Sequence, residues 1–387
     1  MKTLEQQDKS WFKALTKKPK FYEIKSLISR VPDAHYYVVI GERSNGKTYS
    51  ILNYCLERYF EYGEEFVYIR RFDEDIKYSR GCQVFNALVN NKVIEKLSKG
   101  KWNDVYYYAK KWYLKKNATN KKDSIISDTP IAYAIALTSE EHDKSTSYPK
   151  IKNIFFEEFM SRNYLTDEFM LFQNTLSTII RLRNDIKIFM AGNTINKYSP
   201  YFSEMGLTNV KNMKVGTTEI YEYGDSGLKV AVEFSDMPSK DKASNVYFAF
   251  SNPKLSMVRG DGGIWVIDIY PHLSVEMKYK PKDVIYKYYV VWDNDILQCD
   301  IVKLDNTAFT FVHLKTTPIK DDNTNVVYST EHNHKPNYKR RITKANTKQE
   351  EIILWFYKNE KVFYQSNEIG EIMRNYIAWC KKTPIEY

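Results

Sequence analysis

The sequence has no uninterrupted apolar run of roughly 18 residues, which is the length that a membrane-spanning helix requires. Its first residues also lack the apolar core of a secretory signal. Cysteine is scarce, and the cysteines are widely separated, without a CxxC spacing: Cys55, Cys82, Cys299 and Cys380. This pattern excludes a disulfide framework and a cysteine zinc site, and it is typical of buried thiols in a reducing compartment. We therefore expect no membrane partner and no secretion.

Acidic residues are outnumbered by basic ones, with 48 Asp and Glu against 58 Lys and Arg, which gives a formal net charge of +10. Such an excess favours a polyanionic partner such as nucleic acid. An AT-rich genome that uses lysine freely would produce the same excess, and the 32 tyrosines fit that explanation equally well. At roughly 150 residues per domain, the 387 residues allow about two or three domains.

The first half of the sequence alternates between strand and helix patterns. Residues 34–40 form an apolar run that ends at Gly41, and residues 49–60 carry apolar side chains at helical spacing. A second strand is predicted at 65–70, and the short crossover predicts that the two strands pair in parallel within an α/β sheet. Further strands are predicted at 131–137, 154–156 and 186–191, with an amphipathic helix at 169–183.

The pattern changes after Pro200. Residues 215–250 alternate like short antiparallel strands, and residues 251–263 are rich in Ser, Pro and Gly, which is typical of a linker. From residue 264 the chain is again β-rich, and it ends with two helical patterns. The strands predicted in this last part are 264–267, 284–292, 296–304 and 308–314, followed by a polar loop at 318–334.

Residues 41–48, GERSNGKT, fit the pattern G-x-x-x-x-G-K-[ST] between a predicted strand and a predicted helix. The glycines allow a tight turn whose N–H groups converge on a phosphate, and the helix adds its positive N-terminal end. Lys47 would reach the β- and γ-phosphates of ATP, and Thr48 would bind Mg²⁺. The alternative is an ordinary strand-to-helix turn. The residues predicted to bind the nucleotide are Gly41, Glu42, Arg43, Ser44, Asn45, Gly46, Lys47, Thr48 and Tyr49.

A pair of acidic residues, Glu157 and Glu158, follows the predicted strand at 154–156. This order resembles a Walker B element, in which the first acid holds the metal and the second polarises the attacking water. Glu157 stands where most such motifs have Asp, and its extra methylene favours a contact with Mg²⁺ through water. The alternative is an acidic cap of the following helix.

The long spacing between Lys47 and Glu157 leaves room for an additional strand between the two motif strands, which we assign to 131–137. Such an inserted strand is the arrangement of the additional-strand, catalytic-glutamate ATPases, which are typically motors. Nucleotide kinases and small GTPases usually lack it.

Polar residues flank the last strand of this half. Asn193 follows the strand at 186–191 and is predicted to sense the γ-phosphate, although an asparagine after glycine is also common in turns. Arg181 and Arg183 precede the same strand. One of them is predicted to be an arginine finger that reaches the γ-phosphate of a neighbouring subunit. The alternative is a solvated charge at a helix end.

Four segments together resemble the DNA encapsidation (genome-packaging) ATPases of small podoviruses, the group whose motor is assisted by a packaging RNA. The resemblance extends over about residues 30–200, and its most specific features are the RRF sequence after the second strand and the FFEEF run. The segments are GERSNGKTY (41–49), VYIRRFD (67–73), NIFFEEF (153–159) and KIFMAGN (187–193). Glu157 departs from the family's usual Asp.

The resemblance implies a homopentameric ring in the host cytoplasm, bound transiently to the portal (connector) of a prohead, that uses ATP to drive double-stranded DNA inward. It also implies a P-loop ATPase domain at 1–205, a small β-rich linker or lid at 206–263, and a C-terminal α+β domain of RNase H-like, nuclease-derived fold at 264–387. Lys144 matches a second position that acts in trans.

A DNA motor needs sequence-independent contacts with phosphates. Basic residues follow the second strand, and others lie in a lysine- and tyrosine-rich stretch between Lys92 and Lys122 and in an acid-free stretch at 335–348. For each of them a solvated surface is the alternative. The residues predicted to contact DNA are Arg70, Arg71, Lys77, Lys110, Lys111, Lys339, Arg340 and Arg341.

Three other functions compete with a packaging motor. A terminase-like nuclease would need carboxylates that converge on two metal ions, and the candidates are Asp268, Asp293, Asp295, Asp300 and Asp305. A P-loop kinase for a small molecule fits the acidic pair and the long spacing less well. A non-enzymatic nucleic-acid-binding module does not explain the complete phosphate loop.

Overall fold

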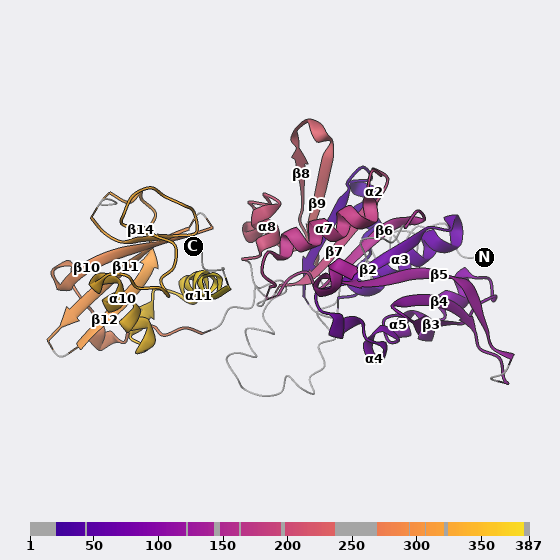
Figure 1. The fold of residues 1–387 in the computed structure, drawn as a ribbon, viewed down its shortest axis with the longest axis horizontal. Coiled ribbons are helices and arrows are strands. Elements are labelled where there is room, and N and C mark those ends of the chain that lie inside the picture. The colour runs from indigo at the N-terminus through magenta and orange to yellow at the C-terminus, as the bar shows by residue number, and fades with distance from the viewer. Residues whose placement is uncertain are drawn as a thin grey trace, which may run out of the picture. The chain divides into compact units, whose positions relative to one another are not determined.

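The computed structural model describes residues 21–42, 45–120, 123–142, 148–161, 164–194, 198–236, 269–293, 295–305, 307–320 and 324–382. Contacts divide the chain into two compact units, Met1–Trp265 and Val266–Tyr387, and Figure 1 shows the ribbon of each. The sequence predicts three parts, and the first two of them, 1–205 and 206–263, both fall within the first unit.

The first unit is built on a nine-stranded sheet, which confirms the predicted α/β class with a mostly parallel sheet. The strands are Tyr36–Gly41 (β1), Glu65–Arg70 (β2), Asp104–Tyr108 (β3), Lys111–Lys116 (β4), Ile125–Ala136 (β5), Ile151–Glu157 (β6), Lys187–Asn193 (β7), Thr218–Tyr223 (β8) and Leu228–Phe234 (β9). Their order across the sheet is β3-β4-β5-β2-β6-β7-β1-β9-β8. Neighbours from β5 to β9 are parallel, whereas the pairs at the two edges are antiparallel.

An additional strand separates the two motif strands, as predicted, but it is β7. The assignment of this strand to residues 131–137 is wrong, because β5 pairs with the far side of β2. The predicted pairing of the first two strands is also wrong, since β6 and β7 lie between β1 and β2. Sequence spacing limits how many strands fit between two motifs, but it does not set their order in the sheet.

The helices of the first unit are Ile24–Arg30 (α2), Lys47–Tyr62 (α3), Tyr78–Gly81 (α4), Asn86–Asn90 (α5), Val93–Leu97 (α6), Glu168–Ile180 (α7) and Pro200–Glu204 (α8). The long helix α3 ends at Gly63, which has φ +73° and donates its N–H to the carbonyl of Tyr59 at 2.8 Å. This is a glycine cap that satisfies an otherwise unpaired carbonyl.

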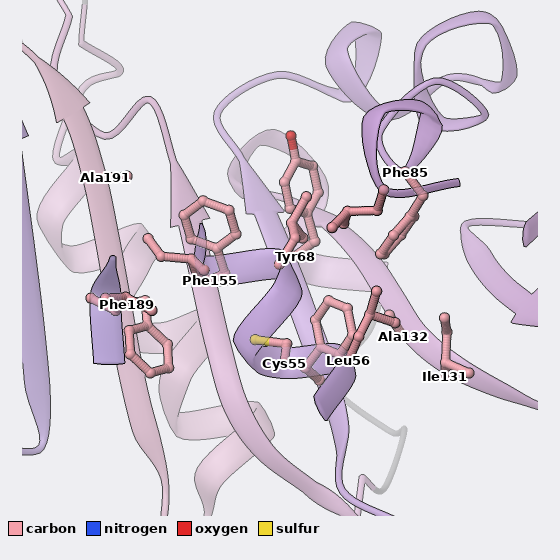
Figure 2. Packing of buried hydrophobic residues seen from close by; sticks show 14 of the residues in the cluster. Cys55, Leu56, Tyr68, Phe85, Ile131, Ala132, Phe155, Phe189 and Ala191 are labelled. Atoms are coloured by element: carbon pink, nitrogen blue, oxygen red, sulfur yellow. The ribbon is translucent and has the colours of Figure 1, made fainter. Parts of the chain in front are cut away.

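Apolar layers cover both faces of this sheet, because successive strand residues point to opposite sides. On one face, Cys55 of α3 packs in a layer with Phe155 and Phe189, and Figure 2 shows these side chains at close range. On the other face, Phe172 of α7 stacks near Phe156, with ring centroids 5.1 Å apart. The two main helices of the unit are thereby fixed on opposite sides of the motif strands.

The lysine- and tyrosine-rich stretch contributes more to the core than its charge suggests. It forms β3 and β4, two strands that the sequence pattern does not reveal. Tyr107 and Trp112 are buried with ring centroids 4.8 Å apart, and the indole N–H of Trp112 donates to the carbonyl of Gly81 at 2.9 Å. These aromatic residues pack a hairpin onto the unit, so they are not a nucleic-acid surface.

The predicted lid at 206–263 differs from what the structure describes. Its strands β8 and β9 belong to the main sheet, where β9 is the parallel neighbour of β1 with Val38 opposite Val232. In Figure 1 the two strands form a long hairpin that extends beyond the neighbouring helices. Residues 237–263, including the predicted linker, lie outside the described residues.

The second unit has a six-stranded sheet in the order β14-β13-β10-β11-β12-β15. Its strands are Val284–Trp292 (β10), Asp295–Leu304 (β11), Thr307–Leu314 (β12), Val327–Ser329 (β13), Tyr338–Lys339 (β14) and Val362–Tyr364 (β15), and its helices are Lys348–Lys358 (α10) and Asn367–Lys382 (α11). Strands β10 to β12 and both helices match the predictions, whereas β13 lies in the predicted polar loop. The predicted strand at 264–267 lies outside the described residues. In the part of the chain that the structure describes, every helix is too short or too polar to cross a bilayer.

Gly81→Ala should destabilise the first unit by about 1–3 kcal/mol, because overpacking a filled site forces its neighbours to move. A Cβ at position 81 would lie 2.2 Å from the ring of Tyr107. The measurement is the urea midpoint of unfolding, with Ser79→Ala at an exposed position of the same helix as the control. Equal midpoints for the two variants would contradict this packing.

Candidate nucleotide-binding site

The phosphate loop and the acidic pair meet at one edge of the sheet. Strands β1, β6 and β7 are parallel neighbours, so their carboxyl ends lie together. A cavity of about 730 Å³ opens there, within the range of small-molecule sites. It is lined by Phe21, Asn45, Gly46, Lys47, Thr48, Tyr49, Leu52, Val84, Ala87, Leu88, Asn91, Glu157, Glu158, Ala191, Gly192 and Asn193.

The loop is held against the neighbouring strand β9. The Asn45 side-chain amide donates to the Ser235 hydroxyl at 2.8 Å, and that hydroxyl donates to the carbonyl of Ile40 at 2.9 Å. A Cβ on Gly41 would lie 2.2 Å from the same hydroxyl, so this close approach requires glycine. Gly46 has φ +96° and leads directly into α3, which explains the second glycine of the motif. Arg43 and Ser44 lie outside the described residues.

Lys47 is 6% exposed, and its ammonium lies in the mouth of the loop. It donates to the carbonyls of Gly41 at 3.2 Å and Glu42 at 2.6 Å, and to the Oδ1 atoms of Asn45 at 3.2 Å and Asn193 at 3.4 Å. Burial lowers the pKa of Lys47 to about 8, although Glu42 and Glu157 act in the opposite direction. The group is thus a cation in an enclosed setting, where an anionic ligand would be bound most strongly.

Glu157 stands at the centre of a polar cluster. One carboxylate oxygen accepts a hydrogen bond from the Thr48 hydroxyl, and the other accepts from the Tyr68 hydroxyl and from Arg70 at 2.9 Å. A hydroxyl and a carboxylate side by side are hard oxygen ligands, which suit Mg²⁺. Magnesium is usually bound by one or two carboxylates together with substrate phosphates, so this pair fits the ion.

Glu158 is the most exposed acid of the cluster, with 54% of its side chain accessible. Its backbone has φ +55°, a left-handed conformation that is uncommon outside glycine. Its carboxylate lines the cavity and accepts a hydrogen bond from Arg70 Nη2 at 2.7 Å. The arrangement leaves an accessible carboxylate in the lining of the cavity.

Arg70 was predicted to contact DNA, but the structure places it in this cluster. Its guanidinium is 16% exposed, donates to both glutamates, and lies 3.6 Å from Asp75 Oδ2. Burial works against its charge, but the neighbouring Tyr68 and the two glutamates raise the pKa of Arg70 above its ordinary value. Arg70 is therefore a permanent counter-charge for the acidic pair.

Arg71, the other arginine of the RRF sequence, also differs from the prediction. It is 6% exposed and forms a bidentate ion pair with Glu168, with both distances 2.8 Å. A guanidinium that is buried and paired in this way does not reach a DNA backbone.

The remaining predicted DNA contacts lie at or near the surface, several of them beside acids of their own chain. Lys77 pairs with Glu74, Lys110 with Asp73, and Lys339 with Glu350. Lys111 lies 5.7 Å from the ring centroid of Tyr133. Arg340 stacks over Trp379, and Arg341 is half-buried.

The two candidate fingers differ in their surroundings. Arg183 donates to the carbonyls of Ile179 at 2.6 Å and Ile151 at 2.7 Å, and more weakly to two others, so it fastens α7 to the sheet. Arg181 is exposed at the end of α7, just before β7 begins. Because β7 runs from that edge towards Asn193, Arg181 lies at the edge of the sheet opposite its own phosphate loop. Lys144 lies outside the described residues.

Sequence reasoning does not identify Tyr68 or Ser235. Tyr68 lies two residues before Arg70, and this spacing on a strand would have placed both on one face. The position of Ser235 depends on β9 lying beside β1, which no local pattern indicates.

The chain matches the sequence model of the Podovirus DNA encapsidation protein (Gp16) over residues 16–245. The DNA packaging protein of Bacillus phage phi29 is 26% identical over 187 residues, which span 47% of this chain and 49% of that protein. The DNA packaging protein of Bacillus phage B103 is 25% identical over 208 residues, spanning 53% and 57%. The chain thus spans about half the length of the curated relatives it matches.

Two solved structures resemble the chain over most of its length. The Phi-28 gp11 DNA packaging motor has a TM-score of 0.52 at 19% identity, covering 95% of this chain and all of that chain. The bacteriophage Phi-29 viral genome packaging motor assembly has a TM-score of 0.53 at 18% identity, covering 92% of this chain and all of that chain. At these identities the likeness shows a shared fold. Because the family match includes more than half of the sequence, the chain belongs to the Podovirus DNA encapsidation protein (Gp16) family.

Proposed function

We propose that this protein is an ATP-hydrolysing motor that moves double-stranded viral DNA into a preformed prohead through the portal. The observation that carries the proposal is the convergence of Lys47, Thr48, Glu157 and Glu158 on one cavity, in a chain of a DNA encapsidation family.

The residues of the cavity divide the chemistry of hydrolysis among them. Lys47 would neutralise the β- and γ-phosphates, and Asn193, 3.4 Å from its ammonium, would respond to the terminal phosphate. Thr48 and Glu157 would hold Mg²⁺, which supplies Lewis-acid stabilisation of the charge that develops on the phosphates. Glu158 would orient and polarise the attacking water, as a general base does.

The apolar residues that line the same cavity suit the base of ATP. Its wall is formed by Tyr49 and Leu52 of α3 and by Val84 and Leu88 beside them. Asn91 also lines the cavity, and its Nδ2 lies 3.4 Å from the Tyr49 hydroxyl. An asparagine amide can match the donor and acceptor of an adenine edge, which supports ATP as the nucleotide.

A ring of identical subunits would complete the site. Arg181 lies too far from its own loop to serve it, so the finger would act on the next copy, and Lys144 is a second candidate for such a contact. A homopentamer bound to the portal, in the host cytoplasm and assisted by a packaging RNA, is the assembly that the family resemblance implies.

The second unit supports an RNase H-like fold through its strand arrangement. Three antiparallel strands, β10 to β12, are extended on the β10 side by β13 and β14, which run parallel to β10. Among the described residues, no three His, Cys, Asp or Glu side chains gather into a metal-binding group, and Asp300 is hydrogen-bonded to Gln298 and Tyr279. Asp268, another candidate metal ligand, lies outside the described residues. We propose that the unit binds DNA, with Lys339, Arg340 and Arg341 as candidate contacts.

Glu158→Gln should bind ATP with nearly unchanged affinity but hydrolyse it roughly 10²–10⁴-fold more slowly, because the amide cannot polarise the water. The measurement is the ATPase rate with and without double-stranded DNA and proheads. Lys47→Ala, which should lose both binding and turnover, is the reference for an inactive loop. Hydrolysis by Glu158→Gln at the normal rate would remove Glu158 from this role.

ATP binding should take up protons above pH 8. Lys47 has a pKa of about 8 in the nucleotide-free protein, and a bound triphosphate would raise that pKa. Affinity should therefore fall as the pH rises above about 8, by up to about tenfold per unit. Calorimetry in two buffers of different ionisation enthalpy measures the uptake by Lys47, which should become small about one pH unit below its pKa, where the ammonium is already mostly protonated. Absence of uptake in the unaltered protein at pH 8.5 would contradict the burial of this ammonium.

Mixing two inactive variants should restore hydrolysis if Arg181 acts in trans. A Lys47→Ala subunit would supply its Arg181 to the intact loop of an Arg181→Ala neighbour, and the mixture should be more active than either variant alone. Asn184→Ala, on the same turn, should be active by itself. Arg183→Ala should instead lower the melting temperature, because several carbonyls lose their donor. No recovery at any mixing ratio would exclude a finger at position 181.

A further inference from the structure

The guanidinium of Arg71 makes more contacts than its ion pair requires. Besides the two bonds to Glu168, Nη1 donates to the carbonyl of Glu158 at 3.1 Å and Nη2 to the carbonyl of Phe159 at 2.7 Å. These are consecutive carbonyls of the turn that follows β6. One side chain directly after β2 therefore holds the backbone of the proposed catalytic turn.

The partner of Arg71 is equally well fixed. The Glu168 side chain is fully buried, and its carboxylate also accepts from the Tyr201 hydroxyl at 2.8 Å and from the Leu165 N–H at 2.7 Å. A buried ion pair is stable only when its remaining hydrogen-bonding capacity is satisfied, as it is here. The Arg71–Glu168 ion pair therefore connects the start of α7 to the end of β2.

The turn at Glu158 and Phe159, which Arg71 contacts, has a strained backbone. The left-handed backbone of Glu158 is disfavoured for residues with a side chain, and such a conformation persists only where the surroundings impose it. Arg71 fixes the carbonyls of this turn, and the N–H of Phe159 donates to the carbonyl of Ala191 at 3.3 Å. This backbone directs the Glu158 side chain into the cavity.

We propose that Arg71 is a positioning residue for hydrolysis: through the carbonyls of Glu158 and Phe159, it holds the Glu158 carboxylate where it can activate water. This inference rests on the proposed function, since it needs Glu158 to be the group that activates water. A purely structural ion pair would need only the bonds to Glu168, whereas the two carbonyl contacts connect the pair to the reacting group.

Arg71→Ala would strand a buried carboxylate, so two milder changes test the proposal. Arg71→Lys keeps the charge opposite Glu168, but a single ammonium cannot reproduce the fork that reaches two carbonyls as well. The double variant Arg71→Met with Glu168→Gln removes both charges together and keeps an acceptor for Tyr201 or Leu165. Both variants should retain the ATP dissociation constant and lower kcat by about 10- to 100-fold, a part of what a placed general base contributes.

The matched control is Arg58→Lys, at a second Arg–Glu pair in which Arg58 Nε donates to Glu64 at 2.8 Å. This pair lies at the opposite end of β2, and kcat should be unchanged there. Unchanged kcat in both Arg71 variants, with hydrolysis lost in Glu158→Gln, would overturn the positioning role alone. Loss of kcat together with ATP affinity or thermal stability would also overturn it, because the role would then be structural. Normal hydrolysis by Glu158→Gln would overturn the proposed role of Glu158 and this inference with it.

Discussion

The common carboxyl edge of β1, β6 and β7 is the constraint on which the rest of the site depends. Parallel neighbours lie about 4.7–4.9 Å apart, and in this register Gly41 is opposite Asn193 and Glu157 is opposite Ala191. The pairing of the strands alone therefore brings together two motifs that are far apart in sequence. The insertion of β7 between the two motif strands also sets the distance across which a phosphate can be held.

Neighbouring arginines at the end of β2 then take two different tasks. Successive residues point in opposite directions, so Arg70 meets the carboxylates of the acidic pair while Arg71 enters the core beside α7. The first neutralises charge that would otherwise repel a nucleotide. Arg71 instead fixes the local structure, because its partners are a buried glutamate and two backbone carbonyls. Two adjacent arginines that look like one basic patch in the sequence therefore have separate structural roles.

The sequence is sufficient to predict that residues 41–48 connect a strand to a helix, that Glu157 and Glu158 stand at a strand end, and that the sheet is mostly parallel, because each rests on a local pattern. Most of the strands are predicted in the same way. Sequence patterns do not predict strand order or side-chain pairing between residues that are far apart in the chain. The additional strand was assigned to 131–137, although only the sheet order decides that β7 occupies this place. The sequence predicts Arg70 and Arg71 as DNA contacts, since nothing in it shows that three acids lie near Arg70 and a buried Glu168 near Arg71. The strands β3 and β4 are missed because β3 carries three adjacent tyrosines and β4 begins and ends with lysines, so neither shows a clear alternation of apolar and polar residues.

The backbone of Glu158 is held in place, whereas its carboxylate can exchange partners. Its backbone is held by a buried, bidentate arginine, and breaking such a pair by removing one partner costs about 3–5 kcal/mol. Its carboxylate, by contrast, meets Arg70 at the surface of the cavity with 54% of the side chain accessible, where an ion pair is worth about 1 kcal/mol or less. A ligand in the cavity can therefore displace Arg70 from this carboxylate without disturbing the turn that carries it. The difference between these two arginine contacts lets one residue be both accurately placed and chemically available.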